Sequence, residues 1–210
     1  MKYVSTRGAA PILGFADVVL AGLANDGGLY VPESWPTLGA VTSGSYAELA
    51  ASVFVPYVGA DIDNATMLRL CNNAYSTFRH PDVVPIVPLE AGHHLIELFH
   101  GATLAFKDVA LQLLGQLFDH ILTLRNEKVT IVGATSGDTG SAAIDGVKNC
   151  ANINIVILYP HGRVSDVQRK QMTTVDSPNV RTVAIDGTFD DCQDLVKAMF
   201  NDAPFREKHN

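Results

Sequence analysis

The chain has 210 residues, and the 47% that are hydrophobic are enough to fill a core. Acidic residues outnumber basic ones by 22 to 15, for a net charge of −7, and no run of Lys or Arg forms a stripe that could follow a phosphate backbone. This balance argues against a nucleic-acid partner. No stretch approaches the roughly 20 apolar residues of a membrane helix, and the first residues lack the apolar core of a signal peptide. We therefore expect a soluble cytoplasmic protein with no membrane partner.

Cysteines and histidines give no sign of a metal centre. Cys71, Cys150 and Cys192 are far apart and have no CxxC partner, which argues against a disulfide framework and a zinc site. The pair His93 and His94 has no HExxH motif around it. We expect reduced thiols, surface histidines and no bound metal.

The first half of the sequence is mostly helical in pattern. Residues 14–24, 45–57 and 67–78 carry apolar side chains at helical spacing, and Ser45 is placed to cap the second of these helices. After the proline-rich VVPIVPLE, the apolar run 95–101 is expected to be a strand that leads into a loop. We expect residues 1–100 to form a mostly helical amino-terminal region.

The second half has the pattern of an α/β fold. A helix is predicted over 106–124, and β-branched runs begin at Val129, Ile153 and Arg181, each followed by a turn and a helical pattern. This βαβαβα order predicts a parallel sheet covered on both faces, with ligands at the carboxyl ends of its strands. Residues 101–210 are thus expected to be an α/β region. No strand follows the last helix, so we expect the sequence to be part of a longer chain.

Lys107, in ELFHGATLAFKD, is the first candidate for chemistry. It lies at the first turn of the long predicted helix, where the amide dipoles disfavour an ammonium group. Burial among Leu104, Phe106 and Val109 would also favour the neutral amine, which is the form that attacks an aldehyde cofactor. The alternative is a lysine that reaches the surface beside Asp108.

The second candidate is GATSGDTGSAA, in which a predicted strand, a glycine loop and a helix follow one another. Backbone amides, the hydroxyls of Ser136 and Thr139, and the helix amino end would together bind a carboxylate or a phosphate. An ordinary capped turn is the alternative. The glycine spacing is neither GxGxxG nor that of a phosphate-binding GK[ST] loop, which argues against a nucleotide site.

A third loop, in YPHGRVSDVQRKQMTT, also follows a predicted strand. Arg163 and Lys170 are candidates for a phosphate contact. The alternative is a solvated loop and helix face.

Taken together, these segments resemble the threonine synthase family, in identity and in order. They are STRG near the start, DGGLYVP, ELFHGATLAFKD, GATSGDTGSAA, YPHGRVSDVQRKQMTT and DGTFDDCQDLV. The lysine of FHGxTLAFKD followed about thirty residues later by SGDTG is the specific part of the match. The sequence has HGATLAF where the family pattern usually reads HGPTLAF, a change that removes no functional group.

The resemblance implies the tryptophan-synthase-β-like fold of pyridoxal-phosphate (PLP) enzymes, fold type II. Lys107 then matches the lysine that binds PLP covalently and acts in catalysis. The loop that approaches the substrate carboxylate matches Ser136, Gly137, Asp138, Thr139 and Gly140. The family's loop for the cofactor phosphate and its partner for the pyridine nitrogen lie further downstream and are absent from these residues.

The activity that the resemblance implies is the conversion of O-phospho-L-homoserine and water to L-threonine and phosphate. We expect the 210-residue piece to be inactive by itself, and the sequence does not indicate an oligomeric state. Serine or threonine dehydratases and cysteine synthases share this fold and cofactor, and they are the nearest alternatives. A non-catalytic fragment with an anion-binding loop is an alternative of another class.

Overall fold

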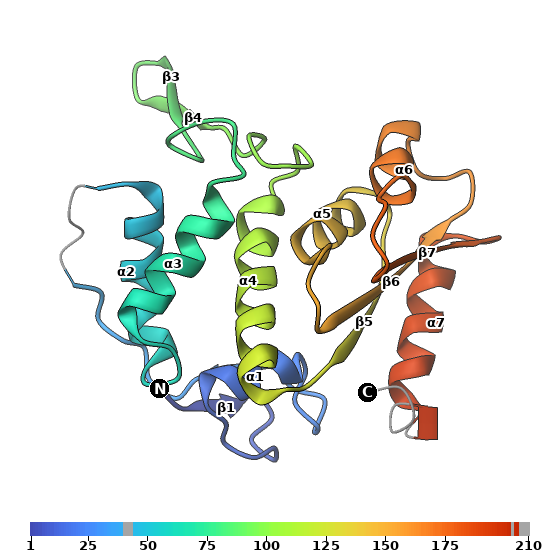
Figure 1. Cartoon of the computed structure of the whole chain (residues 1–210), viewed down its shortest axis with the longest axis horizontal. Helices are drawn as coiled ribbons and strands as arrows, with labels where there is room; N and C mark the ends of the chain where they lie inside the picture. The colour runs from blue at the N-terminus through green and yellow to red at the C-terminus, as the bar shows by residue number, and fades with distance from the viewer. Residues whose placement is uncertain (40–43, 203, 206–210) are drawn as a thin grey trace. The chain divides into compact units, whose positions relative to one another are not determined.

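The computed structural model describes residues 1–39, 44–202, 204 and 205 (Figure 1). Its contacts group the chain into two compact units, Met1–Ser76 and Thr77–Asn210. The division expected near residue 100, into residues 1–100 and 101–210, stays a prediction. In the part of the chain that the structure describes, no helix combines the length and the apolar character needed to cross a bilayer.

The described residues of the first unit form a small antiparallel ribbon and a group of helices. The elements in chain order are β1 (Tyr3–Ser5), α1 (Phe15–Ala21), β2 (Tyr30–Pro32), α2 (Tyr46–Val58) and α3 (Asn64–Tyr75). Ser45 caps α2 as expected, because its Oγ accepts a hydrogen bond from Glu48 N while the Glu48 carboxylate accepts one from Ser45 N. α2 and α3 pack together around fully buried Val58, Met67 and Cys71.

Asp26 connects the STRG segment with the glycine turn that precedes β2. Its carboxylate accepts hydrogen bonds from Ser5 Oγ at 2.8 Å, from Gly28 N at 2.9 Å, and from the amides of Ala9 and Ala10 at 3.0 Å. Partial burial alone would raise the pKa of Asp26, but these hydrogen bonds outweigh it and hold that pKa below its usual value. One carboxylate therefore organises two loops that are distant in sequence.

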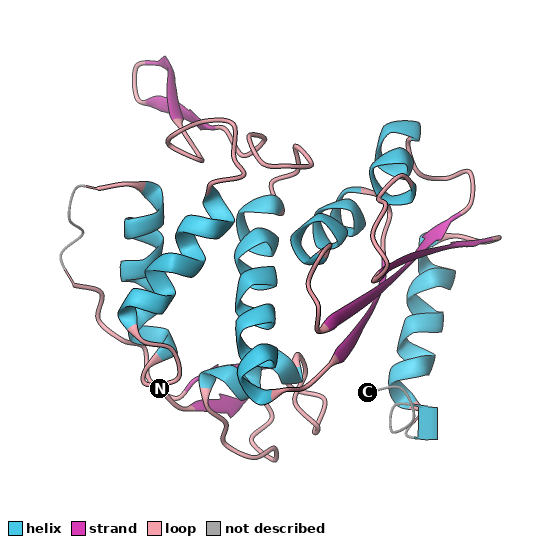
Figure 2. Ribbon diagram, in the orientation of Figure 1, coloured by secondary structure: helices cyan, strands magenta, loops and turns pink. Residues whose placement is uncertain are grey.

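The second unit contains the α/β fold (Figure 2). Its elements are β3 (Ile86–Glu90), β4 (His93–Ile96), α4 (Asp108–Arg125), β5 (Val129–Ala134), α5 (Asp138–Val147), β6 (Ile153–Pro160), α6 (Asp166–Thr173), β7 (Val180–Ile185) and α7 (Phe189–Asn201). Strands β5, β6 and β7 form a parallel sheet in that order, with Val132 opposite Val156 and Leu158 opposite Val183. The parallel sheet and its alternation with helices confirm the expected α/β class.

Helices cover the sheet on both faces. α5 packs on β6, and α7 packs on β5 and β6 from the other side (Figure 1). α4 and α6 both pack against α5. The amino ends of α4, α5 and α6 lie near the carboxyl end of β5 (Figure 1). Apolar side chains with almost no exposure fill these layers: Leu113, Leu122, Ile144, Ile155, Met172 and Cys192.

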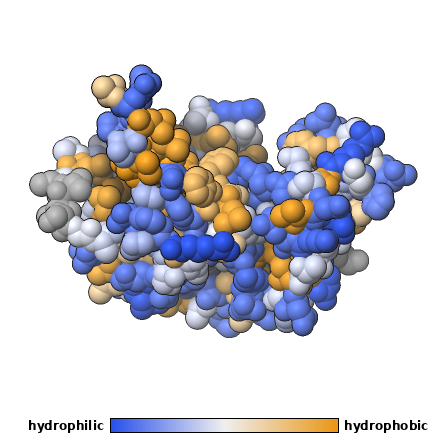
Figure 3. Space-filling model, turned by 90° about the horizontal axis from the view of Figure 1, so that it is seen from above, coloured by the Kyte–Doolittle hydropathy of each residue, from blue (hydrophilic) through white to orange (hydrophobic). Residues whose placement is uncertain are grey.

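The strand expected over 95–101 is wrong in its extent. β4 ends at Ile96 and pairs with β3 as an antiparallel hairpin apart from the parallel sheet. Every residue of both strands is exposed, and Ile86 and Leu89 show 63% and 65% of their surface. Hydrophobic residues gather on the face that carries this hairpin (Figure 3). Only Leu95 and Ile96 of the apolar run lie in this surface hairpin, and the rest of the run is outside any strand.

Candidate active site

Lys107 occupies the N-cap position of α4, immediately after the loop that begins at Gly101. Its Nζ lies 2.8 Å from Asp138 Oδ2 and 4.1 Å from the centre of the Phe106 ring. The burial of Lys107 is partial: its side chain is 27% exposed, while its expected apolar neighbours Leu104 and Phe106 are 51% and 57% exposed and line an open pocket. The charged partner of Lys107 is a carboxylate.

Asp108 shapes the loop that carries Lys107. Its side chain is fully buried and accepts hydrogen bonds from Thr103 N at 2.8 Å and from Thr103 Oγ1 at 2.7 Å. Gln171 of α6 donates to the Thr103 carbonyl at 3.0 Å. Between these anchors Leu104 has a φ of 64°, a conformation that a non-glycine side chain adopts only when its surroundings impose it. Asp108 cannot be singled out from the sequence, because no local pattern shows that its side chain turns inward.

The glycine loop after β5 is organised by Thr135, a second residue that no local sequence pattern singles out. Thr135 Oγ1 is buried and accepts hydrogen bonds from Gly137 N at 3.0 Å and from Gly140 N at 2.8 Å. Asp138 Oδ1 accepts another from Thr139 N at 2.8 Å. These three amides, which we expected to bind an anion, therefore already have partners within the loop. Ser136 is exposed at the turn.

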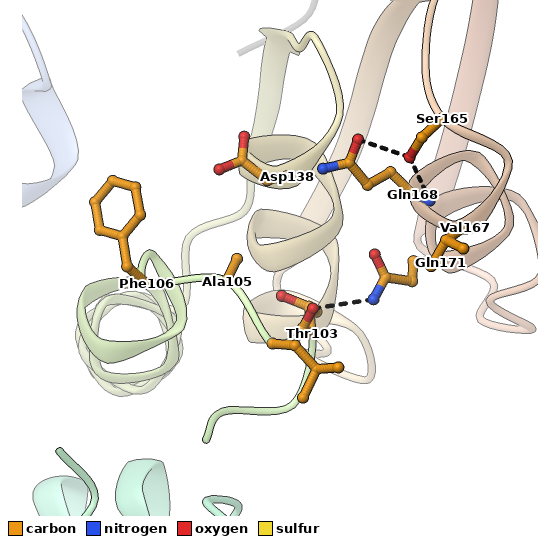
Figure 4. A pocket seen from close by; sticks show the side chains of 9 residues that line it. Thr103, Ala105, Phe106, Asp138, Ser165, Val167, Gln168 and Gln171 are labelled. Atoms are coloured by element: carbon orange, nitrogen blue, oxygen red, sulfur yellow. Dashed lines mark hydrogen bonds between the residues drawn. The ribbon is translucent and has the colours of Figure 1, made fainter. Parts of the chain in front are cut away.

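A pocket of about 480 Å³ lies between the two loops and α6, within the second unit (Figure 4). Asp138 and Phe106 lie toward one side of the view, while Gln168 and Gln171 approach from α6. Its lining residues are Thr103, Leu104, Ala105, Phe106, Asp138, Ser165, Val167, Gln168 and Gln171. The pocket is thus bordered by the partner of Lys107 and by neutral amides.

Electrostatics around Lys107 are dominated by Asp138. The hydrogen bond from Lys107 is the main cause that lowers the pKa of the Asp138 carboxyl; partial burial opposes it, and the charge of Lys107 and hydrogen bonds from Thr139 add to the lowering. The side chains of Lys107 and Asp138 are 27% and 36% exposed, so water still screens the pair.

The candidate phosphate contacts lie apart from this pocket. Arg163 precedes α6 and is exposed. Hydrogen bonds from Thr188 lower the pKa of Asp191, and the charge of Arg163 adds to this lowering. Lys170 is exposed on α6. Neither side chain lines the pocket, and their role as phosphate contacts stays a prediction. Within the described residues, no group of three His, Cys, Asp or Glu side chains could hold a metal ion.

Sequence comparison assigns the chain to a family. The family model described as the threonine synthase N terminus matches residues 2–75. Threonine synthase from Pseudomonas aeruginosa is 54% identical over 210 residues, which cover 98% of this chain and 45% of that protein. The chain belongs to the threonine synthase family. Threonine synthase from Schizosaccharomyces pombe is 46% identical over an alignment that covers 100% of this chain and 44% of that relative.

Solved threonine synthases have the same fold. The crystal structure of PLP-bound threonine synthase from Brucella melitensis superposes with a TM-score of 0.93 at 53% identity, covering 99% of this chain and 46% of that one. Threonine synthase from yeast gives a TM-score of 0.89 at 43% identity, covering 97% and 44%. These likenesses confirm the expected tryptophan-synthase-β-like fold. The chain spans less than half the length of the relatives that it matches.

Proposed function

We propose that the protein to which this chain belongs is a threonine synthase, which uses PLP to convert O-phospho-L-homoserine and water to L-threonine and phosphate. The observation that carries the proposal is the meeting of Lys107 with the SGDTG loop beside a pocket, in a chain 54% identical to a threonine synthase. The solved threonine synthase from Brucella melitensis is PLP-bound, which supports the choice of cofactor.

The residues present fit the aldehyde end of PLP. Lys107 offers a primary amine whose Asp138 partner lines a pocket within the usual size range of ligand sites. When bound, PLP supplies an electron sink for carbanion chemistry. Lys107 would bind the cofactor through its Nζ and, as a free amine, carry protons to and from the α and β carbons of the substrate.

The loop after β5 is proposed to receive the substrate carboxylate. Its residues are Ser136, Gly137, Asp138, Thr139 and Gly140. Ser136 is the member best placed to donate a hydrogen bond, because its side chain is exposed at the turn while Thr135 and Asp138 bind the amides of Gly137, Thr139 and Gly140. The helix amino end also favours a negative charge at this position.

Arg163 and Lys170 are proposed as contacts for the substrate phosphate. Both are exposed cations close in sequence to the pocket residues Ser165, Gln168 and Gln171. Guanidinium and ammonium groups are the usual protein partners of phosphate. A loss of affinity for inorganic phosphate on replacing each with Ala would support this assignment, and unchanged affinity would exclude it.

The decisive experiment measures phosphate and threonine released from O-phospho-L-homoserine by the full-length protein with PLP. Lys107→Ala should remove both products together with the absorbance of bound PLP. Lys197→Ala is the matched control, because Lys197 is an exposed lysine paired with Asp194 on α7. PLP bound through Lys107 without either product would favour a dehydratase or a cysteine synthase. If PLP does not bind at all, the enzyme proposal fails.

The 210-residue chain by itself is proposed to be inactive. It contains the lysine and the carboxylate loop, while the family resemblance assigns the cofactor phosphate to residues further downstream. Assaying the isolated chain beside the full-length protein tests this, and turnover by the isolated chain would contradict it. We also propose a cytoplasmic location, which the three free thiols of Cys71, Cys150 and Cys192 support.

A further inference from the structure

Asp138 is at odds with the role that the resemblance gives to its loop. A loop that receives the substrate carboxylate gains nothing from a second carboxylate, because like charges a few ångströms apart repel each other. The side chain of Asp138 is directed instead to Lys107, 2.8 Å from its Nζ. This contact gives Asp138 a different purpose from that of Ser136 or Thr139.

The carboxylate of Asp138 is fixed on both of its oxygens. Oδ2 binds Lys107, while Oδ1 accepts a hydrogen bond from the Thr139 amide at 2.8 Å. Asp138 is also the first residue of α5, where the helix dipole stabilises a negative charge. A carboxylate anchored in this way can hold a flexible lysine at one place.

Few other groups compete for Lys107. The face of the Phe106 ring lies 4.1 Å from Nζ and also attracts a cation. The neighbouring carboxylate of Asp108 is turned into its own loop, where Thr103 donates two hydrogen bonds to it. Among the described residues, Asp138 is therefore the charged group that faces the Lys107 amine.

We propose that Asp138 is a positioning residue for Lys107, and that its carboxylate holds the amine beside the pocket until an aldehyde competes for it. The proposal rests on the proposed function only in taking that aldehyde to be PLP. Removing the charge at position 138 releases the amine from this ion pair but leaves it less well placed.

The test measures how fast acetic anhydride acetylates Lys107 in the full-length protein freed of PLP, near neutral pH. Acetic anhydride reacts with a free amine and not with an amine held in an ion pair, and mass spectrometry reports the site. A simple amine in the same tube serves as the internal standard. Asp138→Asn should raise the rate at Lys107 roughly two- to fivefold, the size expected for a partly exposed ion pair. Asp138→Glu, which keeps the charge, should stay near the wild-type rate.

Asp194→Asn is the matched control, because it removes the carboxylate of another lysine pair, Lys197 with Asp194, and should leave Lys107 unchanged. Thermal unfolding shows whether the Asp138 variants fold. If Asp138→Asn does not fold, raising the ionic strength of the wild-type solution weakens the same pair and should speed labelling of Lys107 relative to the standard. Equal labelling of Lys107 in folded Asp138→Asn and wild type, or no response to salt, overturns the proposal.

A second measurement separates this inference from the proposed function. PLP is added to the cofactor-free proteins, and borohydride reduction followed by mass spectrometry reports how much is attached to Lys107. Asp138→Asn should attach PLP faster than wild type near neutral pH but release threonine more slowly, and an unchanged attachment rate counts against the role of Asp138. If wild type attaches no PLP, the proposed function fails, while the acetylation result still decides the role of Asp138.

Discussion

The backbone of Gly115 in α4 lies directly against the carbonyl oxygen of Gly146 in α5, where a Cβ on Gly115 would overlap that oxygen. In the other direction, a Cβ on Gly146 would lie 2.6 Å from the carbonyl oxygen of Leu111. α4 begins next to Lys107 and α5 begins at Asp138. The glycine contact therefore sets the distance between the two helices whose amino ends carry the candidate site.

Replacing Gly115 with Ala should destabilise the protein by roughly 1–3 kcal/mol, because the added methyl group forces the two backbones apart. The sign of this stability change is informative, because helix propensity alone would make the Gly115→Ala protein more stable than wild type by about 1 kcal/mol. Urea unfolding of the full-length protein measures the change. Leu124→Ala on the same helix, at a side chain that is 70% exposed, should be close to neutral. A Gly115→Ala protein as stable as wild type would show that α4 and α5 can separate freely.

Asp108→Asn should loosen the loop that carries Lys107. An amide cannot accept both hydrogen bonds from Thr103 as a carboxylate does, so we expect a loss of roughly 1–3 kcal/mol in unfolding free energy. We also expect a lower kcat, because Lys107 would be less well placed. Asp166→Asn is the control, since that carboxylate is 85% exposed. A normal kcat and stability in Asp108→Asn would mean that Thr103 does not need this anchor.

Gly137→Ala should destabilise the SGDTG loop for two reasons that a second substitution separates. Gly137 has a φ of 146°, which alanine rarely adopts, and a Cβ there would overlap Gln168 Oε1. We expect a loss of roughly 1–3 kcal/mol. Adding Gln168→Ala removes the overlap but not the backbone strain, so stability should return only in part. Thermal unfolding measures the stability of both variants. If the double variant regains the full stability of the wild type, the φ angle at position 137 is not a cause of the loss.

Asp26→Asn should destabilise the protein in a way that depends on pH. Because the pKa of Asp26 is lowered on folding, its carboxylate contributes stability above the unfolded value of about 3.9, and that contribution is lost as the pH falls through the lower folded value. The gap in Tm between wild type and Asp26→Asn should therefore be widest near neutral pH and narrow below about pH 4. Asp194→Asn, at a side chain 74% exposed, should show a much smaller gap throughout. A constant gap for Asp26→Asn would contradict this account.

Local patterns in the sequence predicted most of the secondary structure. The long helix was expected over 106–124 and is found at Asp108–Arg125, and the runs starting at Val129 and Ile153 are strands that begin at those residues. The cap at Ser45 was also predicted. These features depend on neighbours within a few residues, so spacing and side-chain type suffice to find them.

Tertiary structure decided which of these elements meet and how the candidate site is built. Lys107 is only partly buried, and of the strand expected over 95–101 only the first two residues lie in a strand, the exposed hairpin strand β4. The pairings of Lys107 with Asp138 and Gly115 with Gly146 join residues about thirty positions apart, and no local period predicts them. They follow from how α4 packs on α5, which depends on the sum of many small contacts and on where backbone atoms can approach closely. The sequence alone determined the elements and the family resemblance; packing determined the partner of the lysine.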